Sequence, residues 1–140
     1  MENFEPSGRL FDEINTVNGI ALKYNGVDDA CLPQKDWKLF VFKENELVKT
    51  VPLQSKSFFL IGKESKVVDI LTEHPSCSRQ HSVIQFRPKG PYIMDLESSN
   101  GTFLNNEKIR KKRFYELRSK DIIKFGGSTR EYVLVCDIPE

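Results

Sequence analysis

Residues 74–82, HPSCSRQHS, bring together side chains that can bind a metal, act as a nucleophile or hold an anion. A metal site would use His74, Cys77 and His81. Pro75 and three serines oppose the helix that would align these ligands, and a structural zinc ion takes about four ligands. A Cys–His or Ser–His nucleophile needs a third orienting group and an oxyanion hole, for which the chain has no recognisable motif. We therefore expect neither a metal, nor another cofactor, nor an enzyme.

Phosphate binding is the chemistry whose further requirements the sequence meets. A phosphate group binds short hydroxyl donors, backbone N–H groups of tight loops, and cations. Ser78 and Arg79 supply a hydroxyl and a cation, and two other segments supply similar groups. Gly62–Lys63 ends a predicted strand, and Ser99–Asn100 precedes Gly101, which permits a sharp turn with a positive φ. Loops between strands can gather at one end of a β-sandwich, where three such segments could bind one ligand.

Short β-strands are the elements that must position these loops. From Trp37 onward, β-rich segments alternate with turn signals, and no window of about a dozen residues keeps a helical period. The predicted strands are 37–43, 46–53, 58–63, 66–71, 81–87, 91–97, 101–105, 107–109, 114–117, 121–126 and 131–138. Short strands at even spacing predict an all-β sandwich or barrel rather than an alternating β/α fold.

The chain has 140 residues, which fits a single domain with one core and a tail. In residues 1–35, Pro, Gly and Asn interrupt scattered apolar residues that follow no period. We predict that residues 1–35 form an irregular N-terminal arm and that residues 36–140 form the folded domain. The arm could dock on its own domain, dock on a partner or stay mobile, and its composition favours a partly disordered terminus.

The charge balance limits the classes of partner. Lys plus Arg (21) nearly equal Asp plus Glu (20), so a net charge of +1 gives no chain-wide attraction for nucleic acid. We expect no direct RNA binding beyond nonspecific contact. The basic run 108–114 is expected to be solvated turn surface, with an acidic partner or RNA phosphates as the alternative. No apolar run approaches membrane-spanning length, so no membrane partner is expected. Three cysteines without a CxxC pair favour a reducing compartment over a disulfide framework.

Three motifs, in this order and spacing, resemble those of the forkhead-associated (FHA) domain. They are Gly62-Lys63, then Ser78-Arg79-Gln80-His81, then Asn100-Gly101-Thr102 followed by Phe-Leu-Asn. The resemblance covers roughly residues 36–138 and implies an FHA-type β-sandwich of about eleven strands. It also implies that loops at one end of the sandwich bind phosphothreonine peptides.

The resemblance implies a role for each matching residue. Ser78 would donate its hydroxyl to the phosphate, and Arg79 would contact the phosphate or the peptide backbone. Asn100 would form hydrogen bonds with the peptide main chain, and Ser99 would line the same loop. His81 would tie the Ser78 loop to the neighbouring loop. The residues expected to support the site structurally are Gly62, His81, Gly101 and Thr102.

Lys63 departs from the family pattern, which has an arginine at this position. An arginine meets a phosphate with two parallel N–H bonds, whereas a lysine acts as a point charge. Losing one charge-assisted hydrogen bond costs about 1–2 kcal/mol. The resemblance therefore leaves two possibilities: a working phosphopeptide pocket of reduced strength, or a structural scaffold subunit whose pocket is weakened or unused.

Longer segments are similar to the FHA subfamily found in the yeast pre-mRNA retention and splicing (RES) complex. This resemblance implies a nuclear protein, with the cytoplasm as a second location, that acts in pre-mRNA splicing and in retention of unspliced pre-mRNA. The expected partners are a phosphothreonine-containing protein and other splicing-complex subunits, including one with an RRM domain. Members usually carry a further basic N-terminal region that contacts the RRM protein, so this contact is expected to use sequence N-terminal to the present chain. Whether the native protein extends beyond Met1 stays open. The matching segments are 7–25, 37–43, 74–82, 91–109, 114–117, 121–126 and 128–135.

Overall fold

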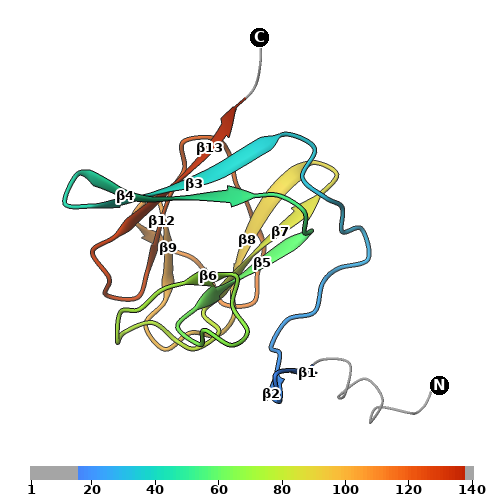
Figure 1. Cartoon of the computed structure of the whole chain (residues 1–140), viewed down its shortest axis with the longest axis horizontal. Helices are drawn as coiled ribbons and strands as arrows, with labels where there is room; N and C mark the ends of the chain where they lie inside the picture. The colour runs from blue at the N-terminus through green and yellow to red at the C-terminus, as the bar shows by residue number, and fades with distance from the viewer. Residues whose placement is uncertain (1–15, 138–140) are drawn as a thin grey trace.

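A computed structural model gives the structure of residues 16–137, which contain strands but no helix (Figure 1). Eleven strands, β3 to β13, form two sheets that pack face to face, as the FHA resemblance implies. One sheet has six strands in the order β10-β9-β12-β13-β3-β4, and the other has five in the order β11-β8-β7-β5-β6. The predicted all-β sandwich is therefore confirmed. Because the described residues contain no helix, none of them forms a helix able to cross a membrane.

All strand pairs in the sandwich are antiparallel except β5 and β6, which pair parallel. The strands of the six-stranded sheet are β3 (Asp36–Lys43), β4 (Glu46–Leu53), β9 (Thr102–Leu104), β10 (Glu107–Lys108), β12 (Ile122–Phe125) and β13 (Glu131–Asp137). Those of the five-stranded sheet are β5 (Phe58–Gly62), β6 (Ile70–Leu71), β7 (Ser82–Arg87), β8 (Gly90–Asp95) and β11 (Tyr115–Glu116).

Alternating apolar residues explain how the two sheets pack. Leu39 and Val41 of β3 are buried in the core between the sheets. Strand β7 buries both of its faces: Ile84 and Phe86 enter that core, whereas Val83 belongs to a second apolar cluster. Because successive side chains of a strand point to opposite faces, this second cluster covers the outer face of the five-stranded sheet.

The N-terminal arm supplies the cover for that outer face. Its first described residues form a small hairpin of β1 (Thr16–Val17) and β2 (Ile20–Ala21), joined by Asn18 and Gly19, which both have a positive φ. Tyr24 follows, 8% exposed, with its ring edge-on to Phe58 at a centroid distance of 5.1 Å. The described part of the arm thus docks on its own domain. Residues 1–15 lie outside the described structure, and the boundary after residue 35 stays a prediction.

One predicted strand is much shorter in the structure. Of the predicted segment 66–71, only Ile70 and Leu71 form a strand. The backbone N–H groups of Val67 and Val68 both donate to the Glu64 carbonyl, which makes a turn there instead. The apolar pattern of this segment was a correct sign of packing, since Val68 contacts the outer cluster, but not of strand pairing. Residue 138, the end of the last predicted strand, lies outside the described residues.

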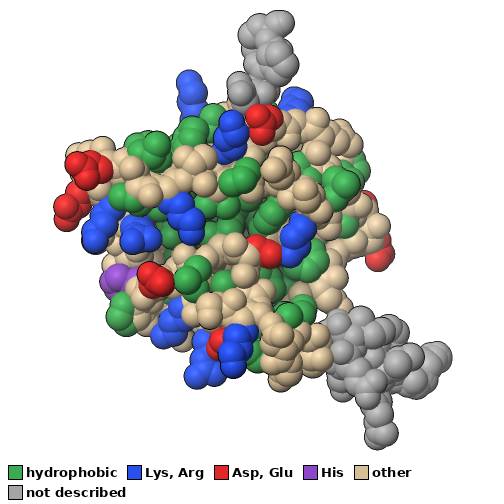
Figure 2. Space-filling view, in the orientation of Figure 1, with side chains coloured by type: hydrophobic (Ala, Val, Ile, Leu, Met, Phe, Trp, Pro, Cys, Tyr) green, Lys and Arg blue, Asp and Glu red, His purple; other side chains and the backbone are tan. Residues whose placement is uncertain are grey.

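Acidic and basic side chains both occur over the face shown in Figure 2, as the near-zero net charge suggests. The basic side chains of the run 108–114 are exposed around the short strand β10, which agrees with solvated turn surface. The fold therefore offers local rather than global electrostatic attraction.

Candidate functional site

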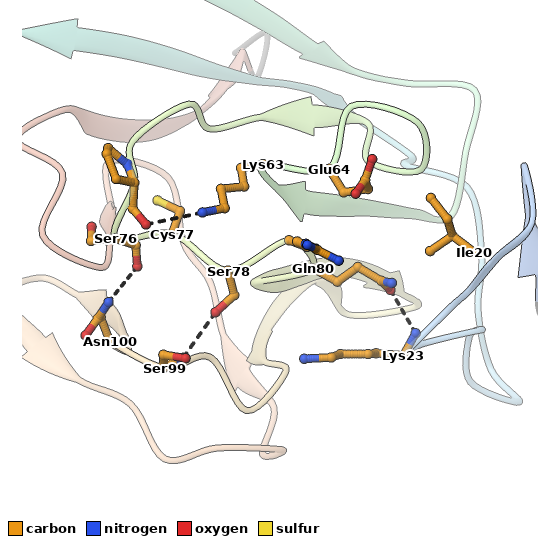
Figure 3. A pocket seen from close by; sticks show the side chains of 12 residues that line it. Ile20, Lys23, Lys63, Glu64, Ser76, Cys77, Ser78, Gln80, Ser99 and Asn100 are labelled. Atoms are coloured by element: carbon orange, nitrogen blue, oxygen red, sulfur yellow. Dashed lines mark hydrogen bonds between the residues drawn. The ribbon is translucent and has the colours of Figure 1, made fainter.

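An open pocket of about 560 Å³ lies where three loops meet at one end of the sandwich (Figure 3). The loops are the one after β5, the one between β6 and β7, and the one between β8 and β9. All five residues predicted to bind phosphopeptide line this pocket, and each is exposed or half-buried: Lys63, Ser78, Arg79, Ser99 and Asn100. The four residues predicted to support the site are all buried: Gly62, His81, Gly101 and Thr102.

Gly62 permits the close approach of the first two loops. The backbone N–H of Lys63 donates to the Ser78 carbonyl at 3.1 Å, and that of Glu64 donates to the Arg79 carbonyl at 3.2 Å. A Cβ atom on Gly62 would lie 2.0 Å from the Arg79 carbonyl oxygen, well inside any real contact. A residue with a side chain would therefore push apart the segments that carry Lys63, Ser78 and Arg79.

His81 joins the second loop to the third. The imidazole is fully buried, and its Nδ1 accepts the backbone N–H of Ser78 at 3.0 Å. Its Nε2 lies 2.8 Å from the Gly101 carbonyl oxygen. An Nδ1 that accepts carries no proton, so Nε2 must be the protonated nitrogen that donates to Gly101. This is the structural link between loops that the sequence resemblance implied for His81.

Burial lowers the pKa of His81 below its ordinary value of 6.5, because charging the imidazole away from water is unfavourable. The hydrogen bond to the Gly101 carbonyl and the Asp95 carboxylate oppose this shift only in part. The neutral ring is also the form that the Ser78 bond requires.

Stability is expected to fall as the pH drops below about 6.5, because the unfolded chain then binds a proton that folded His81 does not. The loss from His81 should be absent above that pH and reach at most about 1.4 kcal/mol at pH 5.5. Long-range ¹H–¹⁵N NMR spectra should show a protonated Nε2 at pH 7 and a titration midpoint below 6.5. A midpoint above 6.5 would contradict the neutral link.

A buried carboxylate shapes the third loop. Asp95, fully buried at the end of β8, accepts the backbone N–H of Ser98 at 3.0 Å and the Ser98 hydroxyl at 2.6 Å. It also accepts the Thr102 hydroxyl at 2.6 Å. The Ser98 oxygen in turn accepts the backbone N–H of Gly101 at 2.9 Å. These bonds fold the third loop, residues 96–101, tightly. Ser99 and Asn100 therefore lie at the tip of that loop.

Direct bonds also connect the pocket-lining residues. The backbone N–H of Ser99 donates to Ser78 Oγ at 3.1 Å, and Asn100 Nδ2 donates to the Ser76 carbonyl at 2.8 Å (Figure 3). Lys63 Nζ donates to the Pro75 carbonyl at 3.3 Å. Among the described contacts the Ser78 oxygen only accepts, which leaves its hydrogen for an acceptor in the pocket.

The pocket carries an excess of positive charge. Three cationic side chains, Lys23, Lys63 and Arg79, line it together with one carboxylate, Glu64. Such a lining favours a dianion. Sequence reasoning missed Lys23 and Gln80, which also lines the pocket. Lys23 carries no motif and lies in the arm, so only its packing on the sandwich reveals it.

The side chains weighed for metal binding or nucleophilic chemistry have separate partners. His74 Nδ1 pairs with Ser76 Oγ at 2.7 Å, and Cys77 Sγ lies 3.7 Å from the Phe125 carbonyl oxygen. His81 is occupied by the two loops described above. Within residues 16–137, no group of three His, Cys, Asp or Glu side chains is arranged to hold a metal ion. The described site is therefore arranged around hydroxyl, amide and cationic groups.

Residues 59–126 match the family model of the FHA domain. Pre-mRNA leakage protein 1 of Saccharomyces cerevisiae is 35% identical over 158 residues, an alignment that covers 88% of this chain and 78% of that protein. The chain belongs to the FHA-domain family. FHA domains are interaction modules rather than enzymes, and the pocket lies where the family motifs meet.

Solved structures agree with this assignment. The FHA domain described here superposes on the yeast Pml1 splicing factor, solved in work on its integration into the RES complex, with a TM-score of 0.76 and 30% identity. That match covers 85% of this chain and all of the other. The MEK1 FHA domain in complex with a HOP1 phosphothreonine peptide matches with a TM-score of 0.59 at 25% identity, over 73% of this chain and 97% of that one.

Longer relatives also share the whole FHA region. Smad nuclear-interacting protein 1 of Mus musculus is 42% identical over 146 residues, which cover 95% of this chain. The chain spans only 38% of the length of that relative.

Proposed function

We propose that this FHA domain binds phosphothreonine peptides as part of a nuclear complex that acts in pre-mRNA splicing and in retention of unspliced pre-mRNA. The observation that carries the proposal is that Lys63, Ser78 and Arg79 line one open, net-positive pocket together with Ser99 and Asn100. Hydroxyl, amide and cationic donors around an opening are the groups that a phosphate on a peptide requires.

The likeness to the yeast Pml1 splicing factor supports the nuclear and splicing parts of this proposal. The partners would be a phosphothreonine-containing protein, recruited through the pocket, and other splicing-complex subunits, including one with an RRM domain. The sandwich would act by recruitment, without catalysis and without a cofactor.

Two contacts favour a second candidate, a scaffold whose pocket is not used. Lys63 Nζ and Asn100 Nδ2 both donate hydrogen bonds to carbonyls of the loop between β6 and β7, so neither group is unbonded in the pocket. A ligand would have to compete with the Pro75 and Ser76 carbonyls for these groups. In the scaffold reading, those bonds would serve only to hold the loops together.

Substitutions in the pocket separate the two candidates. A degenerate phosphothreonine peptide library, screened on the wild-type domain, should yield a binding peptide whose unphosphorylated form does not bind. Ser78→Ala and Arg79→Ala should each weaken that peptide by at least about tenfold, since each removes a hydrogen bond to a charged group. Arg118→Ala, an exposed residue in the turn between β11 and β12, serves as the control and should leave affinity unchanged.

Equal affinity in Ser78→Ala, Arg79→Ala and the wild type would show that this pocket does not bind the peptide. A library that yields no phosphorylation-dependent peptide would favour the scaffold.

A further inference from the structure

Lys23 is a cation that the N-terminal arm places in the pocket. It lines the pocket together with Ser78 and Ser99, although 55 positions of sequence separate Lys23 from Ser78. In Figure 3 its side chain extends from the arm toward the side of the pocket where Ser99 lies, whereas Lys63 enters from another side. Two ammonium groups therefore approach the same opening from different directions.

The backbone around Lys23 is fixed to the phosphate-site motif itself. The Lys23 N–H donates to Gln80 Oε1 at 2.8 Å, and Gln80 Nε2 donates to the Ala21 carbonyl at 2.9 Å. Gln80 is only 6% exposed and lies between Arg79 and His81. This reciprocal pair of bonds is a specific attachment of the arm to the loop that carries Ser78.

Tyr24, the next residue, anchors the arm from the other side. Its hydroxyl bonds to Gln85 Oε1, and its ring packs edge-on against Phe58 and Phe114. Burial raises the pKa of Tyr24 to about 12, so the hydroxyl stays a donor across the physiological range. With neighbours on both sides held in place, the position from which the Lys23 side chain starts is set in advance.

The Lys23 ammonium itself is held only weakly. Its one described hydrogen bond goes to the Leu96 carbonyl at 3.4 Å, longer than the usual distance of about 2.9–3.0 Å. An ammonium group has about three N–H donors, so most of its capacity stays available to a ligand. Leu96 is the first residue of the loop that carries Ser99, which keeps the charge beside the pocket.

We propose that Lys23 is a phosphate-binding residue of this FHA domain, delivered by the arm, and that it supplies a cationic contact which the lysine at position 63 cannot make alone. The inference rests on the proposed phosphothreonine function. A single arginine can give two N–H bonds from one side chain. Here Lys23 and Lys63 would give one each from two sides of the same phosphate. The arm is then a part of the binding site rather than a tail beside it.

Charge-changing variants at Lys23 test this inference. The probe is the phosphothreonine peptide selected from the degenerate library, with inorganic phosphate as a second ligand followed by NMR shifts of the Ser78 and Ser99 amides. Lys23→Gln should weaken the peptide by about tenfold, while Lys23→Arg should keep affinity within about threefold. Lys89→Gln, the same charge change in the exposed β7–β8 turn at the far end of the sheet, is the matched control and should bind as the wild type does.

Each outcome decides the matter. Wild-type binding that Ser78→Ala loses and Lys23→Gln retains would overturn the role of Lys23 and leave the proposed function standing. An equal loss in Lys23→Gln and Lys89→Gln would also overturn it, because net charge alone would then explain the effect. If neither the peptide library nor inorganic phosphate perturbs the wild-type pocket, both the inference and the proposed function are wrong. Thermal unfolding of Lys23→Gln should match the wild type, since the side chain is exposed.

Discussion

Gly62→Ala is expected to lower the free energy of unfolding by about 3 kcal/mol and to abolish phosphothreonine binding. The new methyl group would lie 2.0 Å from the Arg79 carbonyl oxygen and 3.0 Å from that of Ser78. Both contacts are with backbone atoms, which cannot swing aside as the end of a side chain can. Relief requires that the two loops separate, which breaks the hydrogen bonds of Lys63 and Glu64 to the Ser78 and Arg79 carbonyls.

Gly127→Ala provides a matched control for this prediction. Gly127 also lies beside the site, where its N–H donates to Ser76 Oγ, but a Cβ atom there would meet its nearest neighbour at 3.4 Å. That separation is an ordinary van der Waals contact. Gly127→Ala should therefore change the free energy of unfolding by no more than about 0.5 kcal/mol. Urea unfolding and titration with the selected peptide measure the two quantities. If Gly62→Ala unfolds at the same urea concentration as Gly127→Ala, the two loops are less closely packed than the hydrogen bonds imply.

The strands could be predicted from the sequence because their signals are local. Alternation of apolar and polar residues and the turn residues between strands act within a few positions, and both are strong from residue 37 to residue 137. The strand predicted for residues 66–71 is wrong over most of its length because it, too, rested on local signals alone. Its apolar residues do pack, but a turn closed by the Glu64 carbonyl uses backbone groups that a strand would need. Periodicity alone cannot separate these two ways of burying an apolar side chain.

The candidate site could be predicted only where a motif marks it. Gly62–Lys63, Ser78–His81 and Asn100–Thr102 are recognisable by residue type and spacing, and the structure brings them together at one end of the sandwich. Lys23 is not, because its contact with the Gln80 side chain depends on how the arm crosses the outer sheet face. Asp95 and Ser98 mark the third loop weakly in the sequence. An acid at the end of a strand, followed three residues later by a serine, is a pattern that can close a turn.

The docked arm changes how the two candidate functions should be compared. A pocket with Lys63 alone would lack the two-bond contact of the family arginine, which favours an unused site. With Lys23 counted, the same pocket has two lysines and Arg79 around the Ser78 hydroxyl. Under the proposed role of Lys23, the weakness expected from Lys63 would hold for that residue but not for the site as a whole. A variant that begins at residue 36 would lose Lys23 and the hydrogen bonds between the arm and Gln80. Binding assays should therefore use a chain that keeps the arm.

Asp95→Ala is expected to be the most damaging substitution of a side chain near the pocket. It would leave the Ser98 N–H and the hydroxyls of Ser98 and Thr102 buried without their acceptor. Each unsatisfied buried donor costs about 1–3 kcal/mol, and rotation of the two hydroxyls recovers a part of this. We expect a loss of about 3–4 kcal/mol in the free energy of unfolding, together with faster amide exchange at Ser99 and Asn100.

Asp121→Ala is the control for the Asp95 prediction, because Asp121 also caps a turn but at the opposite end of the sandwich. Its carboxylate accepts the Arg118 N–H at 2.8 Å and Asn105 Nδ2 at 3.1 Å, near water. Asp121→Ala should lose about 1 kcal/mol in the free energy of unfolding and bind the phosphothreonine peptide as the wild type does.

Asp95→Asn should lose an amount of stability between those of Asp95→Ala and Asp121→Ala, since an amide keeps one acceptor oxygen. Peptide affinity that survives in Asp95→Ala would mean that Ser99 and Asn100 hold their places without the carboxylate, and that the third loop contributes little to binding.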